Sequence, residues 1–364
     1  MSARVAITHV ELRRVHLPLV TPFRTAHGVE TVRDVLIVRV LGPDAEGWAE
    51  CVAPAEPTYT AEYVDGAHDV LRRFLVPAFA AGEAAPVVKG HPMARAALEV
   101  AVLDAELRAA DRSLAAHLGV TRARVPAGIA LGISGSVPAL LDAVERHVAE
   151  GYRRVKLKIE PGWDLVPVAA VRSRFPDLAL QVDANGSYTL AAADHLGGLD
   201  EFGLLLCEQP LADDDLAGHA ALARRMHTPI CLDETITSAT VAADAIERGA
   251  CSVVNLKVGR VGGLAEAVRI HDHCRARGVA LWCGGMLETG LGRALNVALA
   301  ALPGFTLPGD LSASDRYFHE DLTEPFVLDD GHLAVPAGPG LGVSPRPEVL
   351  AATTRSVETL DLRR

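Results

Sequence analysis

Eight short apolar runs alternate with helical patterns over residues 125–312, and this alternation limits the folds open to the chain more than any other feature. Short apolar runs separated by amphipathic helical segments are typical of parallel strands joined by crossover helices. Eight strands with seven intervening helices are what a closed barrel needs, although an open doubly wound sheet satisfies the same pattern. The predicted strands are the runs at residues 125–133, 154–160, 178–185, 204–210, 229–235, 252–259, 280–286 and 305–312.

The residues before this region are organised differently. Three β-type stretches lie between residues 8 and 53, and two helical patterns follow at residues 61–82 and 92–119. We therefore expect a small antiparallel sheet covered by helices, which is an α+β unit. The glycine- and proline-containing residues after the last run are predicted to fold back onto this unit. These patterns divide the chain into an α+β capping domain (1–124), a catalytic barrel domain (125–318) and a C-terminal segment (319–364).

The composition favours a small molecule as the partner. The net charge is −11, and 22% of the residues are charged, whereas a nucleic acid or an anionic membrane calls for a clustered basic surface. The first residues lack the apolar stretch of a signal peptide, and no later run could span a bilayer, so we expect a cytoplasmic protein. The six cysteines form no CxxC pair, and we expect them to be small buried hydrophobic residues.

Five charged residues occur at almost even intervals, each near the end of a predicted strand. Lys158, Asp183, Glu208 and Asp233 are 25 residues apart, and Lys257 follows 24 residues later. In barrels of this kind the C-terminal strand ends and their following loops build the active site. The five side chains are therefore expected to converge on one carboxylate-bearing substrate.

The three acids of this series predict a divalent metal ion. Burying Asp183, Glu208 and Asp233 close together without compensation would cost more free energy than a fold can spare. Three carboxylates with open positions suit Mg²⁺ or Mn²⁺, whereas zinc more often brings histidine or cysteine. Any one acid could instead be a helix N-cap or a surface residue, but the equal spacing of all three argues against that.

The lysines lie on either side of the acids in strand order. Lys158 is on the second run and Lys257 on the sixth, so closing a barrel places them across its mouth from each other. Lys156 shares a strand face with Lys158, because side chains alternate along a strand, and we expect it to bind the substrate carboxylate. A solvated side chain is the ordinary alternative for a lysine.

Such a set of residues can remove a proton next to a carboxylate. The enediolate product carries two negative charges, which a divalent ion neutralises while a lysine takes the proton. If the second lysine returns a proton to the opposite face, the stereocentre inverts. If a β-hydroxyl leaves instead, the outcome is dehydration.

The sequence motifs around these residues resemble those of a known family. The chain resembles the enolase superfamily in its muconate-lactonizing subgroup, and within it the N-acylamino acid (N-succinylamino acid) racemases that also have o-succinylbenzoate synthase activity. The resemblance covers nearly the whole length. It rests on KLKIEPGWD (156–164), VDAN (182–185), CEQPL (207–211), CLDET (231–235), NLKVGRVGG (255–263), CGGMLETGLGR (283–293), PGDLSASDRYF (308–318) and GPGLGV (338–343).

The resemblance implies a modified TIM barrel, (β/α)₇β, with a capping domain formed by both chain ends. It implies Mg²⁺, which Mn²⁺ or Co²⁺ can replace, on Asp183, Glu208 and Asp233, with Asn185 supporting these ligands. Lys158 and Lys257 would be the paired acid and base of a racemase. The implied substrate is an N-acylamino acid, and the implied assembly is a homo-oligomer, a dimer or an octamer. The implied substrate-binding residues are Phe23, Arg24, Thr25, Tyr59, Ser134, Gly285, Met286 and Ser312.

Several alternatives stay open at this point. o-Succinylbenzoate synthesis could be the main activity. Dipeptide epimerisation is another alternative, but dipeptide epimerases of the same subgroup carry an Asp-x-Asp pair at the eighth strand, whereas this chain has Asp310 and, two positions later, Ser312. A second departure is Val258, which stands after Lys257 where close relatives often have proline. A Schiff-base lyase that uses one lysine as its nucleophile, and a non-catalytic barrel, are alternatives of other classes.

Overall fold

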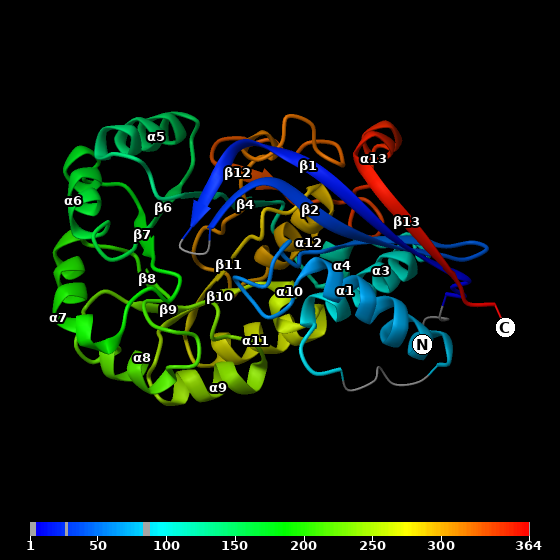
Figure 1. The fold of residues 1–364 in the computed structure, drawn as a ribbon, viewed down its shortest axis with the longest axis horizontal. Coiled ribbons are helices and arrows are strands. Elements are labelled where there is room, and N and C mark those ends of the chain that lie inside the picture. Colours follow the sequence, from blue (N-terminus) through cyan, green and yellow to red (C-terminus); the bar gives the residue numbers. More distant parts are fainter. Residues whose placement is uncertain (1–4, 26–27, 83–87, 364) are drawn as a thin grey trace.

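The structure is a computed structural model that describes residues 5–25, 28–82 and 88–363. Four antiparallel strands form the sheet of the capping domain, in the order β13-β1-β2-β3 within the described residues. Strands β1 (His9–Thr25), β2 (Gly28–Leu41) and β3 (Glu46–Cys51) come from the N-terminal region, and β13 (Thr354–Asp361) comes from the other end of the chain. Because β13 pairs with β1 from His9 to Val15, both chain ends build one sheet. Figure 1 shows the blue β1 beside the red β13.

Helix α3 (Pro92–Ala109) packs on this sheet through a face of small residues. Ala101 and Ala105 are fully buried against β3, and a Cβ atom at Gly47 would lie 2.0 Å from the Ala101 carbonyl oxygen. Only glycine therefore allows β3 to approach the helix so closely. The other helices of this region are α1 (Val64–Val70), a π-helical turn (Leu71–Leu75), α2 (Val76–Ala80) and α4 (Leu114–His117).

Seven parallel strands form the curved sheet of the barrel, in the order β5-β6-β7-β8-β9-β10-β11 within the described chain. Nearly all of their residues are buried, as expected for parallel strands that are covered on both faces. They are β5 (Gly128–Leu131), β6 (Arg154–Lys158), β7 (Leu180–Asp183), β8 (Cys207–Glu208), β9 (Ile230–Leu232), β10 (Val253–Leu256) and β11 (Ala280–Cys283).

Helices cover the outer face of this sheet, and α5 to α9 follow its curve in Figure 1. Four of these helices begin at a serine or aspartate whose side chain accepts a hydrogen bond from a backbone N–H group of the first turn. These residues are Ser136, Asp164, Asp215 and Ser238. The helices are α5 (Val137–Ala149), α6 (Leu165–Arg174), α7 (Ala193–Leu196), α8 (Leu216–Ala223), α9 (Ala239–Glu247), α10 (Val258–Val261), α11 (Leu264–Ala276) and α12 (Gly290–Ala300).

The eighth predicted strand, 305–312, closes the barrel without being a regular strand. Its residues form isolated parallel bridges, Phe305 with Leu281 on one side and Gly309 with Ala127 on the other. Pro308 has no N–H group to donate, so a regular ladder cannot continue through it. The segment nevertheless lies between β11 and the residues that precede β5, as a barrel requires.

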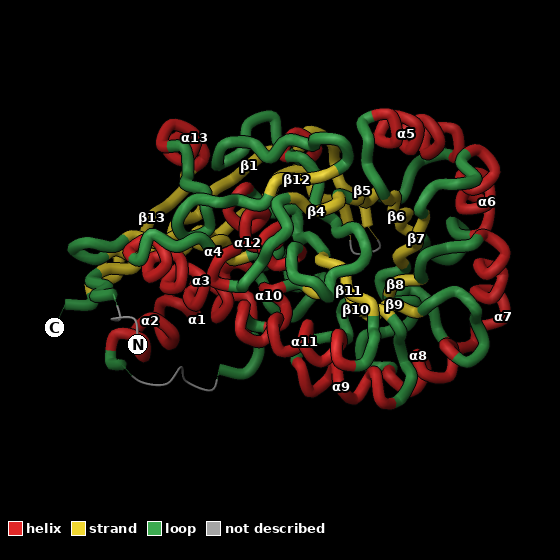
Figure 2. The backbone as a smooth tube through the Cα atoms, turned by 180° about the vertical axis from the view of Figure 1, so that it is seen from behind, coloured by secondary structure: helices red, strands yellow, loops and turns green. Residues whose placement is uncertain are grey.

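The remaining residues return to the capping side. Strand β12 (His332–Ala334) pairs with β4 (Arg124–Pro126), and helix α13 (Pro347–Thr353) leads into β13. In Figure 2 both termini lie on the capping side, away from helices α5 to α7. The predicted fold class is thereby confirmed, while the exact domain boundaries stay predictions.

All six cysteines are buried as predicted. Among the described residues, no helix combines the length and apolar character needed to cross a membrane.

Candidate active site

The strand register brings the five evenly spaced residues to one end of the barrel. Lys158 on β6 is paired with Asp183 on β7, and Asp183 is paired with Glu208 on β8. Asp233 and Lys257 directly follow β9 and β10. The order around the barrel is therefore lysine, three acids, lysine, as predicted from the spacing. All five side chains are buried.

At one end of this series, Lys158 binds Asp183. The Lys158 ammonium lies 2.7 Å from the Asp183 carboxylate and also donates a hydrogen bond to the Asn185 side chain. The Asn185 amide donates in turn to Glu234 (2.7 Å), and its backbone N–H donates to Asp183 (3.0 Å). Burial opposes ionisation of Asp183, but Lys158 and Lys156 outweigh it and lower its pKa.

Glu208 occupies the middle of the series. Its two oxygens accept hydrogen bonds from Lys156 (3.0 Å) and Asn255 (2.7 Å). Burial raises the pKa of Glu208 well above its ordinary value, and the neighbouring Asp183 carboxylate adds to this effect. Lys156 opposes this shift without cancelling it.

At the other end, Lys257 belongs to a network that includes the capping domain. The Lys257 ammonium lies 2.8 Å from Asp233 and 2.8 Å from the hydroxyl oxygen of Tyr59, which is on the loop between β3 and α1. Arg260 donates to both Asp233 and Tyr59. Burial opposes ionisation of Asp233, but Arg260 and Lys257 outweigh it and keep its pKa well below the usual range.

Lys156 has three acidic neighbours. Its ammonium lies 2.6 Å from Asp310, 3.0 Å from Glu208 and 3.1 Å from Asp183. Asp310, on the segment that closes the barrel, also accepts a hydrogen bond from Arg154 at 2.7 Å. Asp310 therefore holds Lys156 against the acid series from the opposite side.

A cavity of about 390 Å³ lies between these residues and the capping domain. The buried Lys156, Lys158 and Lys257 lie at its inner end, and the exposed Val29 and Val32 of β2 line its outer end together with the charged Glu30 and Glu56. The predicted site residues that line it are Phe23, Tyr59, Lys156, Lys158, Asn185, Lys257, Gly285 and Met286.

Four of the predicted substrate-binding residues do not line this cavity in the described structure. Arg24 and Ser134 line a separate pocket on the other side of β1, and Ser312 is buried with its hydroxyl unpartnered. The side chain of Thr25 lies outside the described part of the chain. The roles of these four residues stay predictions.

Sequence reasoning gave no role to several residues of the site, notably Arg260, Glu234, Asp310 and Tyr317. Tyr317 lines the cavity and packs edge-on against Phe23, with ring centroids 6.4 Å apart. No regular spacing in the sequence marks these four residues, whereas the scarcity of lysine adds a second signal for the lysines that were predicted. The chain has only four lysines, and three of them line this one cavity, while Lys89 is exposed.

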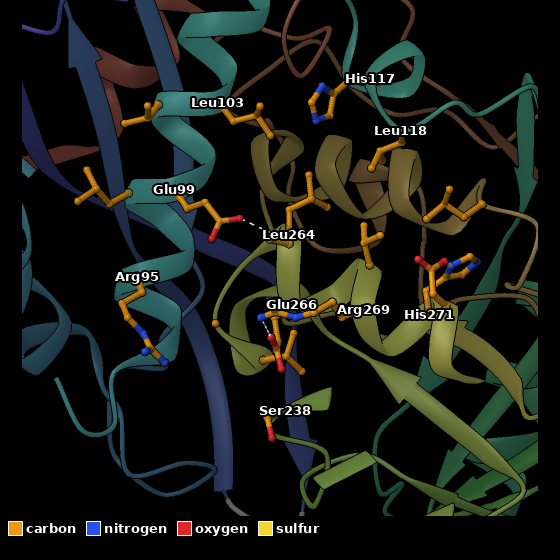
Figure 3. A pocket seen from close by; sticks show the side chains of 18 of the residues that line it. Arg95, Glu99, Leu103, His117, Leu118, Ser238, Leu264, Glu266, Arg269 and His271 are labelled. Atoms are coloured by element: carbon orange, nitrogen blue, oxygen red, sulfur yellow. Dashed lines mark hydrogen bonds and ion pairs between the residues drawn. The ribbon is translucent and has the colours of Figure 1, made fainter. Parts of the chain in front are cut away.

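A larger pocket of about 1260 Å³ lies elsewhere, between α3 and α11. Figure 3 shows Arg95 and Glu99 on α3 facing Leu264 and Glu266 on α11. Two of its acidic side chains have local partners, since Glu99 accepts a hydrogen bond from the Ala265 N–H group and Glu266 is paired with Arg269. Its lining contains none of the five evenly spaced residues, so size alone does not identify the active site here.

The donor chemistry of the three acids fits a hard divalent cation such as Mg²⁺, because all three offer carboxylate oxygens at adjacent strand ends. The raised pKa of the buried Glu208 is consistent with a site that requires more positive charge. As the described side chains stand, no group of three or more His, Cys, Asp or Glu residues is spaced to hold a metal ion. Lys156, Lys158 and Lys257 occupy the carboxylate oxygens instead, so a cation would compete with these ammonium groups.

Comparisons with known proteins agree with this architecture. Residues 139–349 match the family described as "Enolase C-terminal domain-like". The chain is 60% identical to an N-succinylamino acid racemase of Amycolatopsis over 96% of this chain and 97% of that protein. It is 44% identical to an o-succinylbenzoate synthase of Geobacillus kaustophilus over 93% of each chain.

Solved structures give the same result. A member of the enolase superfamily from Listeria innocua superposes with a TM-score of 0.94 at 38% identity, covering 98% of this chain and 99% of that one. The muconate lactonizing enzyme of Pseudomonas fluorescens superposes with a TM-score of 0.90 at 28% identity, over 97% and 100% of the two chains. The chain therefore belongs to the enolase superfamily, in the family of N-succinylamino acid racemases and o-succinylbenzoate synthases.

Proposed function

We propose that this protein racemises N-acylamino acids, with N-succinylamino acids as the reference substrates, by 1,1-proton transfer through an enediolate. One observation carries the proposal: Lys158 and Lys257 line the same cavity from opposite ends of the acid series. A racemase needs one proton-transferring group for each face of the α-carbon. The relatives named N-succinylamino acid racemase, at 60% and 46% identity, support the choice of substrate.

The substrate carboxylate would be bound at the inner end of the cavity, which Lys156 lines, and it would share the Lys156 ammonium group with Asp310 and Glu208. Asp183, Glu208 and Asp233 would hold Mg²⁺, which when bound supplies positive charge against the two negative charges of the enediolate. Asn185 would keep Asp183 in place through its backbone N–H group. The capping residues Tyr59 and Phe23 would cover the substrate and limit the access of water.

Proton transfer would occur at the Nζ atoms of the two lysines. One lysine, in its neutral form, removes the α-proton from one face, and the other donates a proton to the opposite face. Reversing the two roles converts the other enantiomer. Tyr59 and Arg260, which share Asp233 with Lys257, would hold the Lys257 amine toward the cavity.

A second activity, o-succinylbenzoate synthesis, uses the same first step. The relatives named o-succinylbenzoate synthase at 44% identity favour it. After one lysine removes the α-proton, a β-hydroxyl would leave as water with a proton donated by that lysine, which gives the dehydrated product instead of the opposite enantiomer. Both activities therefore depend on the same lysines and acids.

The test is to follow the α-hydrogen of N-succinyl-L-methionine by NMR in D₂O with Mg²⁺, together with optical rotation. The proposal expects α-deuterium incorporation and loss of optical rotation. In parallel, dehydration to o-succinylbenzoate is tested with the substrate of o-succinylbenzoate synthases. Absence of exchange with any N-acylamino acid contradicts the racemase proposal, whereas dehydration without exchange assigns the synthase role. Covalent trapping by borohydride, with activity that survives EDTA, would instead support a Schiff-base lyase.

We also propose that the protein forms a homo-oligomer in solution, an expectation that comes from the family resemblance alone. Light scattering coupled to gel filtration measures the mass directly. A mass equal to the 38.4 kDa of one chain would contradict it.

A further inference from the structure

The loop between β11 and α12, residues 284–289, forms one wall of the active-site cavity. Gly285, Met286 and Leu287 all line the cavity. Leu287 has a φ of 58°, which is a left-handed conformation that a leucine rarely adopts. A backbone strained in this way persists only where its surroundings hold it in place.

The side chain of Glu288 forms hydrogen bonds within this loop, and it does not line the cavity. Its Oε1 atom accepts a hydrogen bond from the Met286 backbone N–H group (2.8 Å) and a second from the Asn296 side chain on α12 (2.9 Å). The Glu288 carbonyl oxygen accepts a third bond from Arg293 at 2.9 Å. Glu288 is only 5% exposed, so these bonds are shielded from water.

The capping domain binds the other end of the same loop through Glu50 of β3. One oxygen of Glu50 accepts hydrogen bonds from the Thr289 backbone N–H group (2.9 Å), the Thr289 hydroxyl (2.7 Å) and the Gly292 N–H group (3.2 Å). Three donors at the start of α12 thus meet one side-chain oxygen of a glutamate from the capping domain. Glu50 thus binds the loop at Thr289, where α12 begins, and Glu288 binds it at Met286.

The two glutamates pack tightly together. A Cβ atom at Gly292 would lie 2.7 Å from Glu288 Cγ and 2.9 Å from the bonded oxygen of Glu50, so there is no space for a side chain between them. Arg33 places a positive charge near both glutamates, and it is buried and also lines the cavity. The cluster therefore reaches from the α12 start to the cavity wall.

We infer that Glu288 is a positioning residue that sets the cavity wall at Met286 and Leu287, and that Glu50 joins this wall to the capping domain. Glu288 does not line this cavity, and within the described residues it forms no hydrogen bond or ion pair with Lys158 or Lys257, so its effect falls on substrate binding and not on proton transfer. The inference rests on the proposed function, because substrate turnover is its readout. A change in Glu288 is expected to alter the Michaelis constant more than the turnover number.

The test compares three variants of Glu288 with the wild type, using N-succinyl-L-methionine. Glu288→Ala removes both accepted hydrogen bonds, and we expect KM to rise about tenfold while kcat falls less than about threefold. Glu288→Gln keeps an oxygen acceptor for Met286, so its KM is expected to stay within about threefold of the wild type. Asn296→Ala is the matched control, because it removes the second donor and leaves the Met286 bond intact, and it should resemble the wild type.

Glu288→Asp covers the case in which the alanine variant does not fold. The shorter side chain keeps the charge but cannot reach both donors, so its KM should also rise. An unchanged KM in a folded Glu288→Ala or Glu288→Asp variant overturns the inference, as does a loss of kcat at constant KM. An inactive wild-type protein would contradict the proposed function, whereas an active wild type with an unaffected Glu288 variant would contradict only the inference about Glu288.

Discussion

Asp310 shows at the scale of a single residue how the barrel holds a charged side chain in place. Its two oxygens bind Lys156 and Arg154, and these two cations outweigh burial and keep its pKa well below the usual range. Arg154 is fully buried and reaches Asp310 across Gly128, where a Cβ atom would lie 2.5 Å from the guanidinium carbon. Neither contact could be inferred from the sequence, because both join residues more than 150 positions apart.

Replacing Asp310 by asparagine is predicted to destabilise the protein strongly. The change leaves two buried cations without their shared counter-ion, and breaking a buried ion pair from one side typically costs about 3–5 kcal/mol. Urea unfolding of Asp310→Asn measures this directly. Asp315→Asn, an exposed neighbour on the same segment, is the control and should stay within about 0.5 kcal/mol of the wild type. A loss below about 1 kcal/mol in Asp310→Asn would show that the pair is not buried as described.

A second prediction concerns the pH dependence of stability. Burial and the neighbouring Glu288 raise the pKa of Glu50 from 4.5 to about 8, against the opposing charge of Arg33 and the hydrogen bonds from Thr289 and Gly292. Between these values the folded chain holds a proton that the unfolded chain has lost, so stability falls as the pH rises.

Glu50→Gln cannot titrate, so its stability relative to the wild type should improve from pH 5 to pH 8, by at most about 1.4 kcal/mol per pH unit. Urea unfolding at several pH values checks this, with the exposed Glu201→Gln as control. A difference between Glu50→Gln and wild type that does not vary with pH would refute the buried, protonated state.

At the scale of elements, the two predicted capping helices are interrupted in the structure. The pattern at 61–82 contains α1, a π-helical turn and α2, and the pattern at 92–119 breaks between α3 and α4. Asp111 has a φ of 47° at this break, and Ser113 forms a bridge with Gly340 of the C-terminal segment. The periodicity of a sequence predicts which face of a helix is apolar. It cannot predict where a helix ends when the end depends on contact with a distant segment of the chain.

Helix α3 also depends on a residue outside its own sequence. Glu62 accepts hydrogen bonds from the N–H groups of Met93 (2.8 Å) and Ala94 (2.9 Å), which are at the start of the helix. Glu62→Ala is therefore expected to lower the free energy of unfolding by about 1–2 kcal/mol, as the loss of an N-cap does. Urea unfolding would measure the loss. Glu145→Ala, which breaks an exposed ion pair with Arg174, should cost less than about 1 kcal/mol, and an equal cost in both variants would contradict the capping role.

At the scale of the whole molecule, the barrel and the order of its charged strand ends could be predicted from the sequence. Parallel strands repeat with their helices, so an even spacing along the chain becomes adjacency around the barrel mouth. The contribution of the capping domain could not be predicted from this regularity. Tyr59 reaches Lys257 from a loop almost 200 positions away, and Arg24 lies on the side of β1 that faces away from the cavity.

The proposed metal site predicts a measurable change in thermal stability. A ligand that binds only the folded state at about 100 times its dissociation constant stabilises it by about 2.7 kcal/mol, which raises Tm by several degrees. Mg²⁺ should therefore raise the Tm of the wild type and of the surface control Asp177→Asn, but not that of Glu208→Gln. If Mg²⁺ raises the Tm of Glu208→Gln equally, the cation does not bind at these acids.

The most direct test of the central claim is enantiomer-specific α-hydrogen exchange in Lys158→Ala and Lys257→Ala, with the exposed Lys89→Ala as control. If the two lysines work on opposite faces of one carbon, each variant loses racemisation by at least about a thousandfold. Each should still exchange the α-hydrogen of one enantiomer in D₂O, and the two variants should prefer opposite enantiomers. Racemisation at the wild-type rate in either variant, or exchange of the same enantiomer by both, would contradict the two-lysine account.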